Sequence, residues 1–190
     1  MSETLMNLVK AFIGESQARN RYTFYAKRAK EEGFMQVAEV FELIADNEKE
    51  HAETLFQLIQ GLKKGVNELV VEAVAPLGYG STVENLRSAI QGEGFEAEEM
   101  YPRFAEVAEH EGLVEVAQRL KAIAVADSHH RERFKRLLDV IEHGWAWRRD
   151  REVHWACMEC GYVHYGREPP EKCPSCGHPR GYFKVKSEEC

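Results

Sequence analysis

Four acidic side chains stand in the apolar stripes of four amphipathic segments, one in each segment. These acids are Glu15, Glu48, Glu93 and Asp127. His51 and His130 each follow one of the acids by three positions, on the same helix face. Burying ionised carboxylates without a partner costs several kcal/mol, so we expect cations among them. An acid on two helices and an acid-x-x-His on two others is the di-metal pattern of helical bundles, and such ligands suit iron or manganese.

Three further side chains could contribute to this site. Glu96 lies one turn after Glu93 and is a candidate seventh ligand, although neighbouring solvated acids make a surface role an alternative. Tyr22 and Tyr101 lie two turns from an acid on the same face. They are either core aromatics or hydrogen-bond partners of ligating carboxylates.

Four cysteines form two Cys-x-x-Cys-Gly turns near the C-terminus, Cys157 with Cys160 and Cys173 with Cys176. Two such turns complete a tetrahedral sulfur site for a metal. A zinc ribbon would only fold this segment, whereas a single iron would also pass one electron, and the surrounding aromatic residues favour iron. Cys190, at the terminus, is expected to be a free exposed thiol.

Helical periodicity predicts four long helices over residues 3–31, 34–62, 81–112 and 113–142. A capping box on Ser81 and Glu84 starts the third, and residues 65–80 form a crossover connection. From about residue 144 the periodicity ends, and Gly, Pro, Cys and aromatic residues dominate, with extended pieces at "GYVHY" and "GYFKV". The expected fold is therefore a mostly α protein, a four-helix bundle followed by a small β-rich metal module.

The second pair of helices is a copy of the first, shifted by 79 positions, so that Tyr22 corresponds to Tyr101 and His51 to His130. We therefore expect internal two-fold symmetry. Glu15 lies seven residues before Tyr22, but Glu93 lies eight before Tyr101. One inserted residue in a helix is typical of a π-bulge, so a bulge or kink is predicted between residues 92 and 102.

Composition narrows the function classes. The chain has 190 residues, 44% of them hydrophobic, and a net charge of -7 without a basic block, which argues against nucleic acid and anionic membranes as partners. No signal peptide or membrane span is evident. All five cysteines lie in the last 34 residues, a pattern that suits metal binding in a reducing compartment, so a cytoplasmic location is expected.

The chain resembles the rubrerythrin family. The motifs are "ESQARNRY" from Glu15, "EKEH" ending at His51, "GEGFEAEEMYP" around Glu93, and the closing "CMECGY" and "CPSCG", and together they cover nearly the whole chain. The resemblance implies a ferritin-like bundle over residues 1–146 with a non-haem di-iron centre. It also implies a rubredoxin-like domain over residues 147–190 with one iron in four thiolates.

Family membership would make this chain a peroxidase that reduces hydrogen peroxide in oxidative-stress defence. Electrons would come from NAD(P)H through a separate reductase or a rubredoxin. They would then pass through the rubredoxin-like iron of a partner in a head-to-tail homodimer or a higher oligomer. No glycine-rich dinucleotide fingerprint follows a strand, so no bound nicotinamide is expected here, nor a haem or flavin.

The resemblance also assigns roles to the residues of the bundle. Glu15 and Glu48 would be bridging or terminal ligands, and Glu93 and His130 would serve one iron. The other iron would exchange His51 for Glu96 on oxidation, with Tyr22 and Tyr101 as partners of the ligands. Asp127 replaces the usual glutamate and is one methylene shorter, so we expect it to bind one metal terminally or through water.

Two alternatives stay open from the sequence. One is a ferroxidase or iron-handling ferritin-like protein whose C-terminal module docks partners or binds zinc. The other is a protein with zinc at both sites, which would be structural only.

Overall fold

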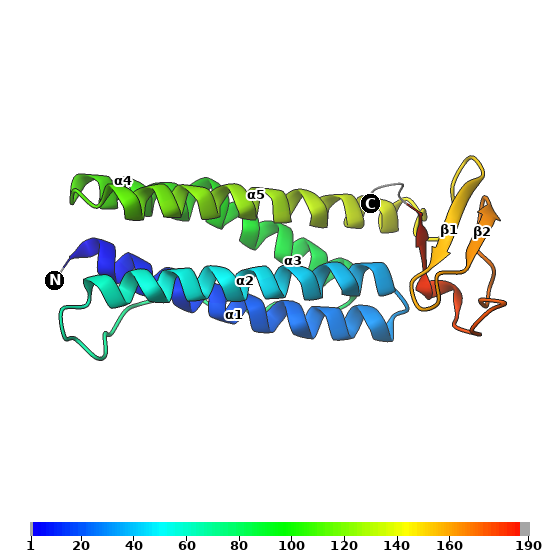
Figure 1. The fold of residues 1–190 in the computed structure, drawn as a ribbon, viewed down its shortest axis with the longest axis horizontal. Coiled ribbons are helices and arrows are strands. Elements are labelled where there is room, and N and C mark those ends of the chain that lie inside the picture. Colours follow the sequence, from blue (N-terminus) through cyan, green and yellow to red (C-terminus); the bar gives the residue numbers. More distant parts are fainter. Residues whose placement is uncertain (1, 187–190) are drawn as a thin grey trace.

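Two long helices, α1 (Glu3–Glu31) and α2 (Met35–Leu62), open the chain as an antiparallel pair in the computed structural model, which describes residues 2–186. The Ser2 hydroxyl caps α1 by accepting a hydrogen bond from the Leu5 N–H. A crossover then leads to α3 (Thr82–Phe95), which begins with the predicted capping box on Ser81 and Glu84. The last helix, α5 (Val114–Glu142), completes a four-rod bundle (Figure 1).

The third helical rod of the bundle, which begins with α3, changes its helical geometry part-way along its length. After α3 the backbone forms one π-helical segment, η1 (Glu96–Met100), and then continues as α4 (Tyr101–His110). The Tyr101 N–H donates to the Glu96 carbonyl, five residues back, as a π turn requires. The bulge predicted between residues 92 and 102 is therefore confirmed.

The core of the bundle consists of two apolar layers. One contains Tyr22, Phe41 and Phe134, and the other contains Leu8, Leu55 and Leu120; all of these side chains are fully buried. Leucine, aromatic and alanine residues at helical spacing pack here as the periodicity predicts. Between the two layers lie the buried acids.

The C-terminal part is a three-stranded antiparallel sheet in the order β2–β1–β3, from strands β1 (Val153–Cys157), β2 (Val163–Gly166) and β3 (Phe183–Val185). Trp155 is fully buried at the centre of the sheet. Strand β2 overlaps the first extended piece expected from the sequence, and β3 lies within the second, whereas β1 lies outside both pieces. The expectation for Cys190 falls outside the described residues.

The sheet docks on one end of the bundle, beyond the end of α5 (Figure 1). Phe34, at the turn between α1 and α2, stacks on Trp147 with ring centroids 5.1 Å apart. Lys184 of β3 pairs with Glu39 of α2 at 2.9 Å. The short 3-10 helix η2 (Arg180–Tyr182) lies so close that a Cβ on Gly181 would be 2.1 Å from the Gly33 carbonyl oxygen. Only glycine fits at this contact.

Replacing Gly181 with alanine is expected to separate the small domain from the bundle, because the added methyl group meets rigid backbone rather than a movable side chain. Overpacking of this kind costs about 1–3 kcal/mol. Small-angle scattering should show a larger radius of gyration, and limited proteolysis should cut faster between residues 143 and 152. Gly61→Ala, on α2 with nothing within 4 Å of the new Cβ, is the control. Unchanged scattering in Gly181→Ala would contradict this account of the docking.

None of the helices in the described part of the chain has a stretch that is long and apolar enough to cross a bilayer.

Candidate metal centres

The buried acids and histidines of the bundle form two overlapping groups. The first contains Glu15, Glu48, His51 and Asp127, and the second contains Glu48, Glu93, Asp127 and His130. Within each group, one ligand atom from every residue lies within 4.8 Å of the others. Glu48 and Asp127 belong to both groups, so the two groups form one continuous cluster that shares two carboxylates.

Distances around the two histidines show how Glu48 is shared. Its Oε2 lies 2.8 Å from His51 Nδ1, and its Oε1 lies 3.1 Å from His130 Nδ1. One carboxylate therefore presents one oxygen to each half of the site. Glu15 approaches His51 Nδ1 at 3.8 Å, and Glu93 approaches His130 Nδ1 at 3.4 Å.

Asp127 also faces both halves. Its Oδ1 lies 3.5 Å from His51 Nδ1 and 3.8 Å from His130 Nδ1. The shorter side chain therefore lies within 4 Å of both histidines, and its expected role as a terminal or water-linked ligand stays a prediction.

Two tyrosines connect the halves of the duplicated site. Tyr22 Oη donates to Glu93 Oε1 at 2.7 Å, and Tyr101 Oη donates to Glu15 Oε1. Each phenol comes from one repeat and holds the glutamate of the other. Burial raises the pKa of both tyrosines well above the ordinary value, so both retain the proton that they donate.

The unsatisfied polar atoms of the site fit bound cations. Seven side-chain atoms are buried without a hydrogen-bond partner: both carboxylate oxygens of Glu48, both of Asp127, Glu93 Oε2, His51 Nδ1 and His130 Nδ1. Buried polar atoms normally have partners, and these oxygens and nitrogens are the ligand types that iron and manganese accept.

The pKa values of the buried acids and of His51 in the metal-free protein also indicate a site for cations. Burial, together with repulsion from Glu15, raises the pKa of Glu48 to about 8 and that of Asp127 to about 12. Burial also raises the pKa of Glu93 to about 7. Burial alone would lower the pKa of His51, but the nearby carboxylates of Glu15 and Glu48 raise it to about 10. Without metal, protons must therefore supply the positive charge that cations would supply in the loaded site.

Glu96 is buried on η1 but, among the described residues, joins neither group. Burial, reinforced by Glu15 and Glu93, raises its pKa well above the ordinary value. A Cβ on Gly14 would lie 3.8 Å from its Oε1, so the carboxyl group faces α1 beside the site.

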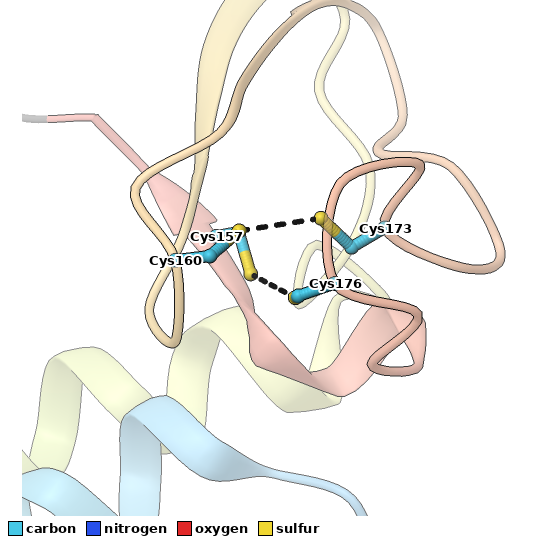
Figure 2. A group of neighbouring side chains, drawn as sticks. All are labelled: Cys157, Cys160, Cys173 and Cys176. Carbon is cyan, nitrogen blue, oxygen red and sulfur yellow. Dashed lines mark hydrogen bonds between the residues drawn. The ribbon is translucent and has the colours of Figure 1, made fainter.

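The four cysteines of the small domain converge from two loops (Figure 2). Gly161 and Gly177 both have positive φ angles, 76° and 77°, and both donate their N–H to the carbonyl of the first cysteine of the turn. This left-handed position requires glycine. The Cys-x-x-Cys-Gly pattern therefore forms the same turn twice and brings two thiols from each turn to one place.

Spacing between the sulfur atoms fits a tetrahedral metal. Cys157 Sγ lies 3.7 Å from Cys176 Sγ, and Cys160 Sγ lies 3.6 Å from Cys173 Sγ. Bonds of about 2.3 Å in a tetrahedron separate the sulfurs by about 3.8 Å. The Tyr162 backbone N–H lowers the pKa of Cys160 to about 6, so this thiol ionises readily, as a metal ligand must.

Two neighbours of these sites did not emerge from the sequence. His178 Nδ1 lies 3.3 Å from Cys176 Sγ, and no spacing rule marks a histidine two residues after the second turn. Arg131 crosses the backbone of Gly94, where a Cβ would lie 2.9 Å from the guanidinium, and it also pairs with Glu98 of η1. A glycine inside a helix was the available signal, because such residues often permit a close approach.

Comparison with known proteins decides the family. A family model for rubrerythrin matches residues 6–138, and a model for the rubrerythrin rubredoxin-like domain matches residues 155–184. The chain belongs to the rubrerythrin family. It therefore has a di-iron bundle and a rubredoxin-like four-cysteine domain, and its family consists of di-iron proteins of oxidative-stress defence. The matches leave residues 139–154 between them, so the domain boundary at 146/147 stays a prediction.

Individual rubrerythrins align along almost their whole length. A putative rubrerythrin of Methanocaldococcus jannaschii is 57% identical, covering 100% of this chain and 95% of its own length. The rubrerythrin of Porphyromonas gingivalis is 45% identical over 96% of this chain and 90% of its own. A solved structure of nigerythrin in a partially reduced state is 34% identical, with a TM-score of 0.66 over 98% of this chain and 88% of that one. The ferritin-like class of the bundle is therefore shown.

Proposed function

We propose that this member of the rubrerythrin family reduces hydrogen peroxide to water. The observation that carries the proposal is the merged site, in which Glu48 and Asp127 belong to both ligand groups and would hold two metals close together. One iron would be bound by Glu15, His51 and the shared carboxylates, and the other by Glu93, His130 and the same carboxylates. When bound, the ferrous pair supplies two electrons that, with two protons, convert hydrogen peroxide into two waters.

The protein's own groups prepare the site for this reaction. Tyr22 and Tyr101 hold Glu93 and Glu15 in place through their phenol protons. The apolar layers on both sides exclude bulk water. His51, with 15% of its side chain exposed, is more open than His130, with 5%, so the His51 half faces solvent. The neighbouring Glu96 is the candidate replacement for His51 when the oxidation state changes.

We also propose that electrons arrive singly through the iron of Cys157, Cys160, Cys173 and Cys176. The donor would be an NAD(P)H-dependent reductase or a rubredoxin. A four-thiolate iron site needs reduced cysteines, which suits a reducing compartment, and we propose the cytoplasm.

Reoxidation of the reduced protein tests the reaction. We expect anaerobically reduced protein to be oxidised rapidly by hydrogen peroxide and slowly by oxygen, as followed by stopped-flow absorbance. The reverse order would support the alternative ferroxidase or iron-handling function and would overturn the peroxidase proposal.

The position of the small domain supports transfer between two chains. From Asp127 to the end of α5 at Glu142 is 15 residues, about 22 Å of helix, and the four-cysteine site lies beyond that end (Figure 1). We therefore propose a head-to-tail homodimer in which each four-cysteine iron serves the partner's di-iron site.

A mixture of two inactive variants tests this arrangement. Glu48→Gln should lack the di-iron centre, and Cys173→Ser should lack the four-cysteine iron. After subunit exchange, mixed dimers should regain reductase-driven peroxide turnover. In these dimers the intact four-cysteine iron of the Glu48→Gln chain lies beside the intact di-iron site of the Cys173→Ser chain. If electrons moved within one chain, the mixture would stay inactive.

A further inference from the structure

A pocket of about 310 Å³ lies beside the metal site. One face of α1, including Gly14, forms one wall, and the rod of α3, η1 and α4 forms the other. The crossover segment around Ala73 covers it, and Glu96 is its buried carboxyl group. This volume is at the lower end of the range of about 300–1,000 Å³ typical of small-molecule sites.

Two glycines of the internal repeat keep the pocket open. Gly14 precedes Glu15, and Gly92 precedes Glu93, so both halves of the repeat carry a Gly-Glu pair. A Cβ on Gly14 would have Glu96 Oε1 as its nearest neighbour, at 3.8 Å, and one on Gly92 would have Arg21 Nη2, at 3.9 Å. Open space therefore lies next to both of these glutamates of the metal site.

The lining indicates a neutral ligand with an apolar body. Phe95, Met100 and Phe104 present apolar surface along the rod. The lining holds both basic and acidic side chains, so no single sign of charge selects an ionic ligand: Lys10, Arg21, Arg103, Glu72, Glu96 and Glu99. Apolar walls contribute nothing to the binding of hydrogen peroxide, which has no apolar part to bury. They would contribute to a larger peroxide.

We propose that this pocket binds organic hydroperoxides and extends the proposed peroxidase activity to them. The apolar body would lie against Phe95, Met100 and Phe104, with the hydroperoxy group at Glu96. The O–O bond would break, and the hydroperoxide would take up two protons and the two electrons that the bound iron pair would supply, giving the alcohol and water. This inference rests on the proposed peroxide reduction, which supplies the electrons.

Two variants fill the pocket from different sides. Gly92→Leu adds a side chain from α3 where the new Cβ has space, and Ala73→Trp adds one from the exposed crossover segment. Neither residue belongs to the two ligand groups. Gly61→Leu, on α2 with nothing within 4 Å of its Cβ, is the matched control.

The first measurement is binding without turnover. Isothermal titration of the oxidised holoprotein with 2-phenylpropan-2-ol, the product expected from cumene hydroperoxide, should show saturable binding. We expect Gly92→Leu and Ala73→Trp each to weaken this binding at least tenfold and Gly61→Leu to leave it unchanged. Absence of binding to the wild type would overturn the proposal.

Kinetics form the second measurement. We expect cumene hydroperoxide to reoxidise the reduced wild type, and the ratio of its kcat/KM to that of hydrogen peroxide to fall at least tenfold in both variants. An unchanged ratio would overturn the pocket assignment. If hydrogen peroxide reacts and cumene hydroperoxide does not, this inference fails while the proposed function stands. If neither reacts, the proposed function fails, and the inference fails with it.

Discussion

Glu48→Gln is expected to remove both irons of the bundle and to leave the single iron of the four-cysteine site in place. Glu48 directs one oxygen toward His51 and the other toward His130, and an amide cannot replace a carboxylate that faces two cations. Loss of partners around metal ligands costs about 10–100-fold in affinity or activity. Loss of a shared ligand should therefore lower peroxide turnover by at least about 100-fold. Metal analysis per chain and single-turnover kinetics measure both effects.

Misfolding can be separated from loss of metal in this variant. Without metal, Glu48 is a buried acid that is repelled by Glu15, so its neutral amide replacement should make the metal-free protein at least as stable as the wild type at pH 8. Glu50→Gln, an exposed position on the same helix, is the control and should keep the full iron content. Retention of two irons in the bundle of Glu48→Gln would contradict the shared role of Glu48.

Metal-free protein is expected to lose stability as the pH rises from 5 to 8. In the folded chain the pKa values of Glu48, Glu93 and Asp127 are about 8, 7 and 12, against unfolded values near 4.5, 4.5 and 3.8. Between each pair of values the folded state holds a proton that the unfolded state has released. The free energy of unfolding therefore falls by about 1.4 kcal/mol per pH unit for each such proton. His51, whose pKa rises from 6.5 to about 10, acts in the same direction above pH 6.5.

Iron-loaded protein should not share this trend. Metal ligands must be deprotonated, so metal affinity rises with pH, and binding to the folded state adds stability. Thermal unfolding at pH 5, 6, 7 and 8 should show a falling Tm without metal and a flat or rising Tm with iron. A Tm of the metal-free protein that increases over this range would contradict protonation of the buried acids.

Elements with a local physical cause could be predicted from the sequence. Apolar periodicity and the capping box on Ser81 gave the helices, and the glycine after each Cys-x-x-Cys pair indicated the two turns of the sulfur site. The position of the π segment followed from comparing Glu15–Tyr22 with Glu93–Tyr101, because an inserted residue must be accommodated within the helix.

Features that depend on how distant elements meet could not be obtained this way. Helical spacing shows that Asp127 is buried, but only the approach of four helices shows that it faces both histidines. Helical spacing also cannot show that Glu96 lies beside the two ligand groups. The contact of Gly181 with the Gly33 carbonyl joins residues 148 positions apart in the sequence, and neither residue carries a side chain that signals it.

The π segment η1 corrects the direction in which Tyr101 points relative to Glu93. A regular helix turns about 100° per residue, so the seven residues from Glu15 to Tyr22 bring the tyrosine back within about 20° of the glutamate. The eight residues from Glu93 to Tyr101 would leave the second tyrosine about 80° away, pointing off the site. Because the π-helical segment η1 accommodates the extra residue, this rotation does not build up, and Glu93 and Tyr101 both face inward. It also gives only one half of the duplicated site an additional buried acid, Glu96, so the two metal positions cease to be chemically equivalent.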